Sequence, residues 1–293
     1  MSALFTRLFF QPISGQDIGM FRTLFCGTVL IGHVLFLPFH LSFYSASIDA
    51  DIKLFLINFF PDMQYALVLT LALTITAGLT LTIFGAFTRP ALIVATASFF
   101  IFYKPVIDIL TLHHAQLPFL ILLILSVTPH IGAFSFFRQN KPSTEGITVN
   151  SWPLVLPLLL LGISYFGAGY WKIIDGGLPQ FTGEVLQYYL AYYGFIRGID
   201  ISLFLSGLPL WILAILSTGV IIFQISFLLI FIFPTLEKLY IPIGILFHIS
   251  IIVLFHISDF PLFYASAYFA SLRYQTTKQV FQKLRSLYNK LHN

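Results

Sequence analysis

The stretch that decides the fold is residues 152–174, which read WPLVLPLLLLGISYFGAGYWKII. It holds one charged side chain, Lys172, close to its end. An apolar run of about 20 residues forms a helix long enough to cross the ~30 Å hydrocarbon layer of a bilayer. We therefore predict a membrane-spanning helix here, with a lysine near one boundary of the membrane.

The composition extends this prediction to the whole chain. Hydrophobic residues make up 58 % of the 293 residues and charged residues only 9 %, far from the proportions of soluble proteins. The sequence predicts an all-α fold, a polytopic transmembrane helical bundle of about eight spans in the cell membrane. The third and eighth spans are short, so we expect them to be tilted or half-inserted. The expected spans lie near residues 18–43, 64–87, 90–103, 115–136, 152–174, 208–233, 239–257 and 259–272.

Positive charge gathers on one side of these spans. Loops rich in Lys and Arg face the cytoplasm, so both termini are predicted to be cytoplasmic. The net charge of +4 then reflects topology, and no nucleic-acid partner is expected. The basic side holds Arg7, Arg22, Arg89, Arg138, Lys141, Lys238, Arg273, Lys278, Lys283, Arg285 and Lys290; the opposite side holds Lys53, Lys104 and Arg197, with Lys172 at the boundary.

Two segments outside the long spans differ from them in composition. Residues 273–293 are predicted to form a basic amphipathic cytoplasmic tail lying on membrane lipid, after a transmembrane domain of residues 1–272. Residues 178–200 are rich in tyrosine, and we expect a re-entrant or interfacial segment that covers the outer face above Lys172. The apolar positions of the tail are Val280, Leu284, Leu287 and Leu291, and the tyrosines are Tyr188, Tyr189, Tyr192 and Tyr193.

Lys172 is the first candidate functional residue, because an ionisable group within a span is costly to bury. A helical side chain leans over the preceding turn, where Ala168 and Gly169 are small enough to leave a groove beside the amine. A structural role is the alternative, since cations favour the last turn of a helix and Asp175 could pair with the amine. Both interpretations stay open on these residues alone.

Further polar residues are expected on the outer side or near the middle of the spans. His113 and His114 open the fourth span, His248 lies within the seventh, and Glu184 follows Lys172 in the outer segment. In one bundle these groups could share an outward cavity, where histidine shuttles protons and lysine acts as a general base. Histidines in spans also serve simply as hydrogen-bond partners of neighbouring helices. No metal is expected, because no HxxxH, HExxH or Cys/His cluster is present.

Four stretches resemble, in order, motifs of the membrane half of vitamin K-dependent gamma-carboxylase and its bacterial relatives. These proteins are grouped as HTTM (horizontally transferred transmembrane) domain proteins. The resemblance covers nearly the whole chain, and the lysine motif is its most specific part. The stretches are residues 17–25 (DIGMFRTLF), resembling LxxFRxxF; 112–115 (LHHA); 165–173 (YFGAGYWKI), resembling YxxAGxxKL; and 246–249 (LFHI).

The resemblance implies roles for individual residues. Lys172 falls on the lysine that serves as the base toward reduced vitamin K, and His114 and His248 fall on histidines near the quinol. The implied cofactor is reduced vitamin K or another menaquinol-like quinol, whose tail can remain in lipid. Residues expected to contact it are Tyr165, Gly169, Glu184 and Tyr188.

Departures from the family limit what is carried over. The chain is expected to lack the large extracytoplasmic domain of the carboxylase, Phe181 replaces a tryptophan, and Gln224 stands where an acidic residue is common. Short members more closely resemble proteins needed to mature a sporulation-delaying peptide toxin. The sequence predicts a bacterial cytoplasmic-membrane protein, binding a reduced quinone and acting on a secreted or membrane peptide. The alternative is a non-catalytic factor for peptide maturation or export; the oligomeric state is left open.

Overall fold

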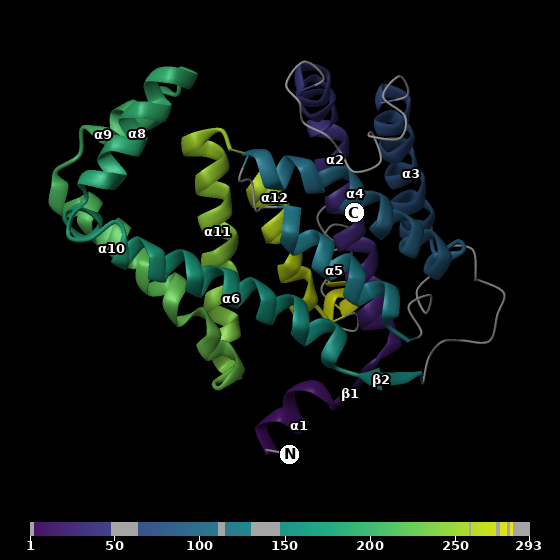
Figure 1. The fold of residues 1–293 in the computed structure, drawn as a ribbon. Coiled ribbons are helices and arrows are strands. Elements are labelled where there is room, and N and C mark those ends of the chain that lie inside the picture. Colours follow the sequence, from purple (N-terminus) through teal and green to yellow (C-terminus); the bar gives the residue numbers. More distant parts are fainter. Residues whose placement is uncertain are drawn as a thin grey trace, which may run out of the picture. The chain divides into compact units, whose positions relative to one another are not determined.

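The computed structural model is built almost entirely from helices (Figure 1), which confirms the all-α prediction. Its described part contains one sheet, a short antiparallel pair of strands. The chain divides into two compact units, residues 1–156 with 269–293, and residues 157–268. The described residues are 3–47, 64–110, 115–129, 147–257, 259–273, 276–279 and 282–283.

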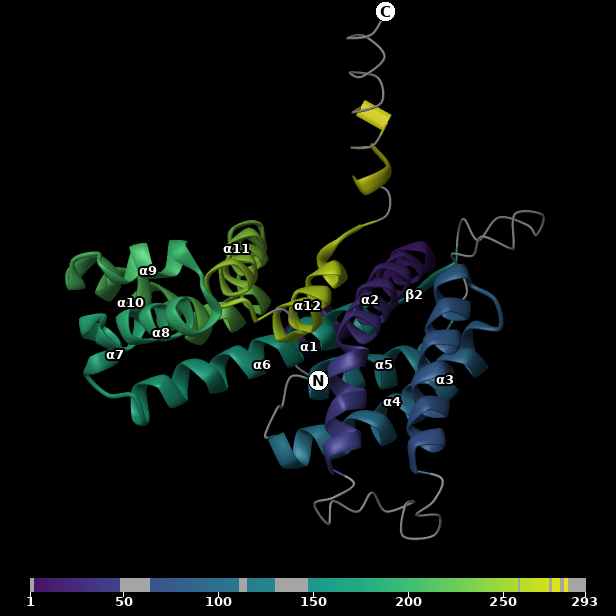
Figure 2. The ribbon, with the colours of Figure 1, turned by 90° about the horizontal axis from the view of Figure 1, so that it is seen from above.

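The first unit is a set of antiparallel helices closed at one end by the two strands. Helix α3 packs along both α2 and α4, and α4 packs along α5 (Figure 2). Strand β1 pairs with β2 in a register that places Ile13 opposite Val149. The elements are α1 (Ala3–Phe9), β1 (Pro12–Ser14), α2 (Gly15–Ser47), α3 (Gln64–Phe84), α4 (Thr88–Leu110), α5 (Gln116–Val127) and β2 (Thr148–Asn150).

Small residues and one buried histidine hold this unit together. A Cβ added at Gly78 would lie 2.8 Å from Ala95 Cβ, so glycine allows α3 and α4 to approach closely, as is common between membrane helices. His33 is fully buried; its Nε2 lies 3.3 Å from the Ala72 carbonyl oxygen and its Nδ1 3.0 Å from the Tyr103 hydroxyl. Because a carbonyl only accepts, Nε2 carries the proton and Tyr103 donates to Nδ1. His33 therefore has the structural role expected of a membrane histidine.

The second unit contains most of α6, whose first turn belongs to the first unit. Helices α8 and α9 form a hairpin, and α8 also packs on α10 and α11. The elements are α6 (Trp152–Ile174), α7 (Pro179–Thr182), α8 (Glu184–Arg197), α9 (Asp200–Ser206), α10 (Leu210–Ser226), α11 (Glu237–Phe255) and α12 (Asp259–Ala265), with 3-10 helices η4 (Phe227–Phe231), η5 (Pro234–Leu236) and η6 (Ser266–Ser271).

Five described segments are long and apolar enough to cross a membrane, and they coincide with the first, second, fifth, sixth and seventh expected spans. The third expected span lies within α4. The fourth and eighth correspond, in the described residues, to shorter helices, α5 with 12 residues and α12 with 7. The chain is thus a multi-pass membrane protein, whereas the count of eight and the sidedness stay predictions. The five segments are Gly15–Ser42, Tyr65–Phe84, Trp152–Ile174, Leu210–Phe231 and Pro234–Phe255.

The tail and the boundary at residue 272 also stay predictions, because most of residues 274–293 lie outside the described residues. The same holds for His113 and His114, which fall in the undescribed residues 111–114. The site described below therefore rests on the second unit alone.

Candidate functional site

Lys172 makes a direct hydrogen bond to another span. Its Nζ donates to Oε1 of Gln224, at a distance of 2.9 Å. Lys172 is half-buried in the last turn of α6, and Gln224, in α10, is only 3 % exposed. Gln224 is thus the hydrogen-bond partner of the candidate base. From the sequence, this residue was noted only as a departure from the HTTM pattern.

Gly169 explains how α10 comes so close to Lys172. A Cβ at this position would lie 2.8 Å from Ile225 Cγ1 and 3.2 Å from Gln224 Cβ. The expectation of an open groove beside the amine is therefore wrong. Helices in lipid pack most closely at small residues, so α10 fills the space that Gly169 leaves.

Neither of the two nearby acidic residues pairs with the amine, so the alternative in which Asp175 is its partner is not observed among the described residues. Asp175 and Glu184 are both exposed, and no hydrogen bond or ion pair joins either of them to Lys172 among the described residues. Asp175 follows the end of α6 in a turn, and Glu184 is the first residue of α8. Lys172 thus has a neutral carboxamide as its hydrogen-bond partner among the described residues, the side chain of Gln224.

A second polar cluster lies deeper along α6. The Tyr165 hydroxyl is 2.6 Å from His248 Nε2 and 2.5 Å from the Tyr268 hydroxyl. All three side chains are at most 2 % exposed. Gly244 makes room for this arrangement, because a Cβ there would overlap the Tyr268 hydroxyl. The cluster joins α6, α11 and η6 through polar groups that are shielded from the surroundings.

The three hydroxyl and imidazole groups form a chain that can run in two directions. Either Tyr268 donates to Tyr165 and Tyr165 to His248 Nε2, or Nε2 donates to Tyr165 and Tyr165 to Tyr268. The other imidazole nitrogen, Nδ1, is buried and has no hydrogen-bond partner among the described residues. A proton that enters at one end and leaves at the other would reverse the chain, which gives the cluster the form of an acid–base relay.

The two polar clusters lie on one face of α6. Tyr165 and Lys172 are seven residues apart, which places them two turns, or about 10.5 Å, apart along the helix axis. Phe223, the neighbour of Gln224, packs its ring 5.4 Å from the Tyr165 ring. Both clusters therefore sit on the surface where α6 meets α10.

The other predicted site residues lie elsewhere in the unit or outside the described residues. Tyr188 is 60 % exposed on α8, where its ring stacks on Tyr192 at 5.8 Å. Glu184 begins the same helix. Their roles in binding a cofactor stay predictions, as does the role of His114. Tyr268, the third member of the cluster around Tyr165, was not predicted from the sequence.

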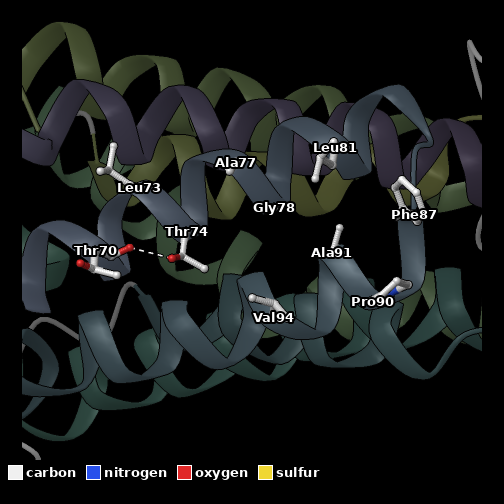
Figure 3. Close-up of a pocket in the computed structure, with 10 residues that line it drawn as sticks. All are labelled: Thr70, Leu73, Thr74, Ala77, Gly78, Leu81, Phe87, Pro90, Ala91 and Val94. Carbon is white, nitrogen blue, oxygen red and sulfur yellow. Dashed lines mark hydrogen bonds between the residues drawn. The ribbon is translucent and has the colours of Figure 1, made fainter.

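One described cavity lies in the first unit. Figure 3 shows a groove of about 640 Å³ between α3 and α4, lined by residues such as Leu73, Leu81 and Val94. Its two threonines, Thr70 and Thr74, donate their hydroxyl protons to carbonyls of their own helix at 2.7 Å. The groove thus presents an apolar surface to lipid, with no acid–base group in its lining.

A smaller cavity of about 300 Å³ lies between α4 and α5, with Lys104 and Gln116 at its rim. Neither cavity includes Lys172 or His248. In the described ranges, no three His, Cys, Asp or Glu side chains lie close enough together to hold a metal ion.

Comparison with known proteins adds nothing to this geometry: no protein-family model, curated protein or solved structure matches the chain. The HTTM resemblance therefore stays a prediction.

The packing at Gly169 can be tested with a matched pair of substitutions in α6. Gly169→Ala is expected to lower the melting temperature, because the new methyl group forces α6 and α10 apart at a cost of about 1–3 kcal/mol. Gly167→Ala is the control, since a Cβ at Gly167 has no neighbour within 4 Å. Thermal unfolding in detergent, followed by circular dichroism, measures both. Equal melting temperatures for the two variants would contradict the close approach at Gly169.

Proposed function

We propose that this chain is an integral membrane enzyme of the HTTM type, related in mechanism to vitamin K-dependent gamma-carboxylase. It binds a reduced quinone and acts on a secreted or membrane peptide at the extracytoplasmic face, with Lys172 as the base. The observation that carries the proposal is the hydrogen bond between the half-buried Lys172 and the buried Gln224, with Lys172 within a span and on the same helix face as Tyr165 of the Tyr165–His248–Tyr268 cluster.

The choice of a carboxamide as partner suits a base. A base must be neutral before it accepts a proton, and a carboxylate would instead hold the lysine as an ammonium ion by direct charge attraction. Gln224 Oε1 accepts one N–H of the amine, which orients the side chain without supplying a counter-ion. Lys172 is thereby held in place, and its nitrogen takes up the proton of a weakly acidic hydroxyl group.

The residues around Lys172 fit a quinol with few polar contacts. A bound quinol supplies acidic hydroxyl groups and reducing equivalents, and its apolar tail is compatible with the surrounding lipid. Lys172 and the amide nitrogen of Gln224 offer hydrogen-bonding groups beside the last turn of α6. His248 Nδ1, buried without a partner, is a second polar atom that a bound group or water would satisfy.

The test uses the full chain, purified in mild detergent and supplied with reduced vitamin K and oxygen. Formation of the vitamin K epoxide, detected by chromatography, is the expected result, with a quinone retained in native mass spectrometry of the freshly purified protein. Boiled protein is the control for spontaneous oxidation. Epoxide at the level of the boiled control, together with no bound quinone, would refute the proposed chemistry.

The hydrogen bond between Lys172 and Gln224 also supports the second candidate, a non-catalytic membrane factor for peptide maturation or export. In that function the amine ties α6 to α10 and has no chemical role. Arginine carries more donors than lysine and can bond to the same carboxamide oxygen. This candidate therefore predicts that Lys172→Arg keeps full maturation of the peptide in cells.

A further inference from the structure

The outward face of α8 is apolar although it is exposed. Tyr188, Tyr189, Tyr192, Phe195 and Ile196 recur at helical spacing and are between 44 % and 82 % exposed. No charged residue interrupts this stripe of five residues, hereafter the α8 stripe. Charges stand only at the two ends of the helix, with Glu184 in its first turn and Arg197 in its last.

Helix α8 is too short to cross the membrane. Its 14 residues extend about 21 Å, compared with a hydrocarbon layer of ~30 Å. The helices beside it are shorter still, with 4 residues in α7 and 7 in α9. None of these three helices alone crosses the membrane.

The start of α10 and the end of α11 also lie on one side. The segments Leu210–Phe231 and Pro234–Phe255 are each long and apolar enough to cross the membrane, and only two residues separate them, so we infer that the second segment returns to the side where the first begins. Leu210 and Phe255 therefore mark the same membrane boundary. This conclusion needs only the two spans and the short connection within the second unit.

Both ends of α8 are fastened at this boundary. At the N-terminal end, a Cβ on Gly183 would lie 2.6 Å from the Leu210 carbonyl oxygen, so the helix starts directly against the first turn of α10. At the C-terminal end, Arg197 Nη1 donates to the Phe255 carbonyl at 2.9 Å and also to the His256 carbonyl. A helix attached at both ends to one boundary lies along the membrane plane, which excludes a re-entrant path for α8.

Helix α9 lies at the same membrane boundary as α8. Ser202 Oγ donates to the Leu254 carbonyl oxygen, and Gln187 of α8 donates to the carbonyl of Ser206 at 2.9 Å. Gly194 packs against Leu203, where an added Cβ would lie 2.9 Å from Leu203 Cγ. The two helices thus form one layer, and Phe204 of α9 is 73 % exposed beside the α8 stripe.

The chemistry of the α8 stripe identifies what it contacts. Among the described residues, Tyr188, Tyr189 and Tyr192 have ring contacts but no hydrogen-bond partner for their hydroxyls. A surface of apolar rings that carry unsatisfied hydroxyls matches the head-group region of a bilayer, where tyrosine is enriched. We propose that α8 and α9 form an interfacial hairpin, with the α8 stripe in contact with phospholipid head groups and glycerol backbones.

Spin labelling of the full chain tests this orientation directly. The native cysteine is replaced (Cys26→Ser), and single labels are placed by Tyr188→Cys, Phe195→Cys and, on α9, Phe204→Cys. Ile222→Cys, in the middle of the α10 span and 61 % exposed, is the deep reference. Each protein is reconstituted into vesicles of phosphatidylcholine and phosphatidylglycerol, and collision rates with oxygen and with a water-soluble nickel complex give the depth of each label.

The expected result is that the three hairpin labels lie at one shared depth. This depth is shallower than that of the label at Ile222→Cys, but still within the bilayer and not in the surrounding water. A depth that increases steadily from position 188 to position 195 would overturn the proposal in favour of re-entry. Free access to the nickel complex would place the hairpin in water. Low access to both reagents would show that protein, such as a second copy, covers the α8 stripe. Monodisperse gel filtration of each variant confirms that the label leaves the fold intact.

Discussion

Replacing Lys172 with alanine is expected to reduce quinol oxidation about 10²–10⁴-fold, the usual contribution of a general base. The variant loses the only group that takes up the substrate proton in the proposed mechanism. Lys172→Arg is expected to fail as well, because arginine does not deprotonate in proteins. Both variants are assayed by epoxide formation from reduced vitamin K, with protein concentration matched by absorbance.

Asp175→Ala is the matched control for this prediction. Asp175 is an exposed charged residue three positions after Lys172, and it forms no ion pair with the amine in the described structure. Its removal should leave turnover unchanged within a factor of about two, well below the effect of one lost hydrogen bond to a charged group. If Lys172→Arg instead retains wild-type turnover, Lys172 is not the base, and the Gln224 hydrogen bond is structural.

Loss of activity in Lys172→Ala must be separated from loss of structure. The substitution removes the partner of Gln224, which is nearly fully buried, and an unsatisfied buried amide costs about 1–3 kcal/mol. The double variant Lys172→Met with Gln224→Leu replaces both partners by apolar side chains of similar size, which relieves that cost. This variant should regain the melting temperature of the wild type and remain inactive.

The long spans could be predicted from the sequence because the signal is local. An uninterrupted apolar run such as residues 152–174 has one favourable conformation in lipid, a helix. For the segment of residues 178–200, the sequence left open whether it is re-entrant or interfacial. That question depends on which span ends Arg197 and Gly183 contact, and such contacts are tertiary.

The site was predicted in part for the same reason. Lys172 and His248 stand out as ionisable residues in apolar runs, and the structure places Lys172 in a half-buried hydrogen bond and His248 in a buried one. Their partners were not predictable: Gln224 lies 52 residues after Lys172, and Tyr268 lies 103 residues after Tyr165. Spacing along the chain carries no information about pairing across helices. Glu184 was expected near Lys172 only because both residues were assigned to the outer side of the membrane. A shared side does not imply that two residues are in contact.

Tyr165→Phe is expected to cause the largest loss of stability of any single-atom deletion in the second unit. The missing hydroxyl oxygen serves both His248 Nε2 and the Tyr268 hydroxyl. Its removal leaves His248 Nε2 unsatisfied, at a cost of about 1–3 kcal/mol, and takes one hydrogen-bond partner away from the Tyr268 hydroxyl. Since Nδ1 already has no partner in the described structure, the imidazole would then be without any hydrogen bond. We expect a clear drop in melting temperature.

A double-mutant cycle with His248 distinguishes this network from a loss of packing. Phenylalanine keeps the ring of Tyr165, including its contacts with Phe223 and Phe227 at 5.4 and 5.1 Å. If the hydrogen bond to His248 dominates, Tyr165→Phe combined with His248→Leu should cost less than the sum of the two single variants. Strict additivity would show that the hydroxyl and the imidazole do not interact. In that case the melting temperature of Tyr165→Phe would be governed by Tyr268 alone, which Tyr268→Phe tests in the same assay.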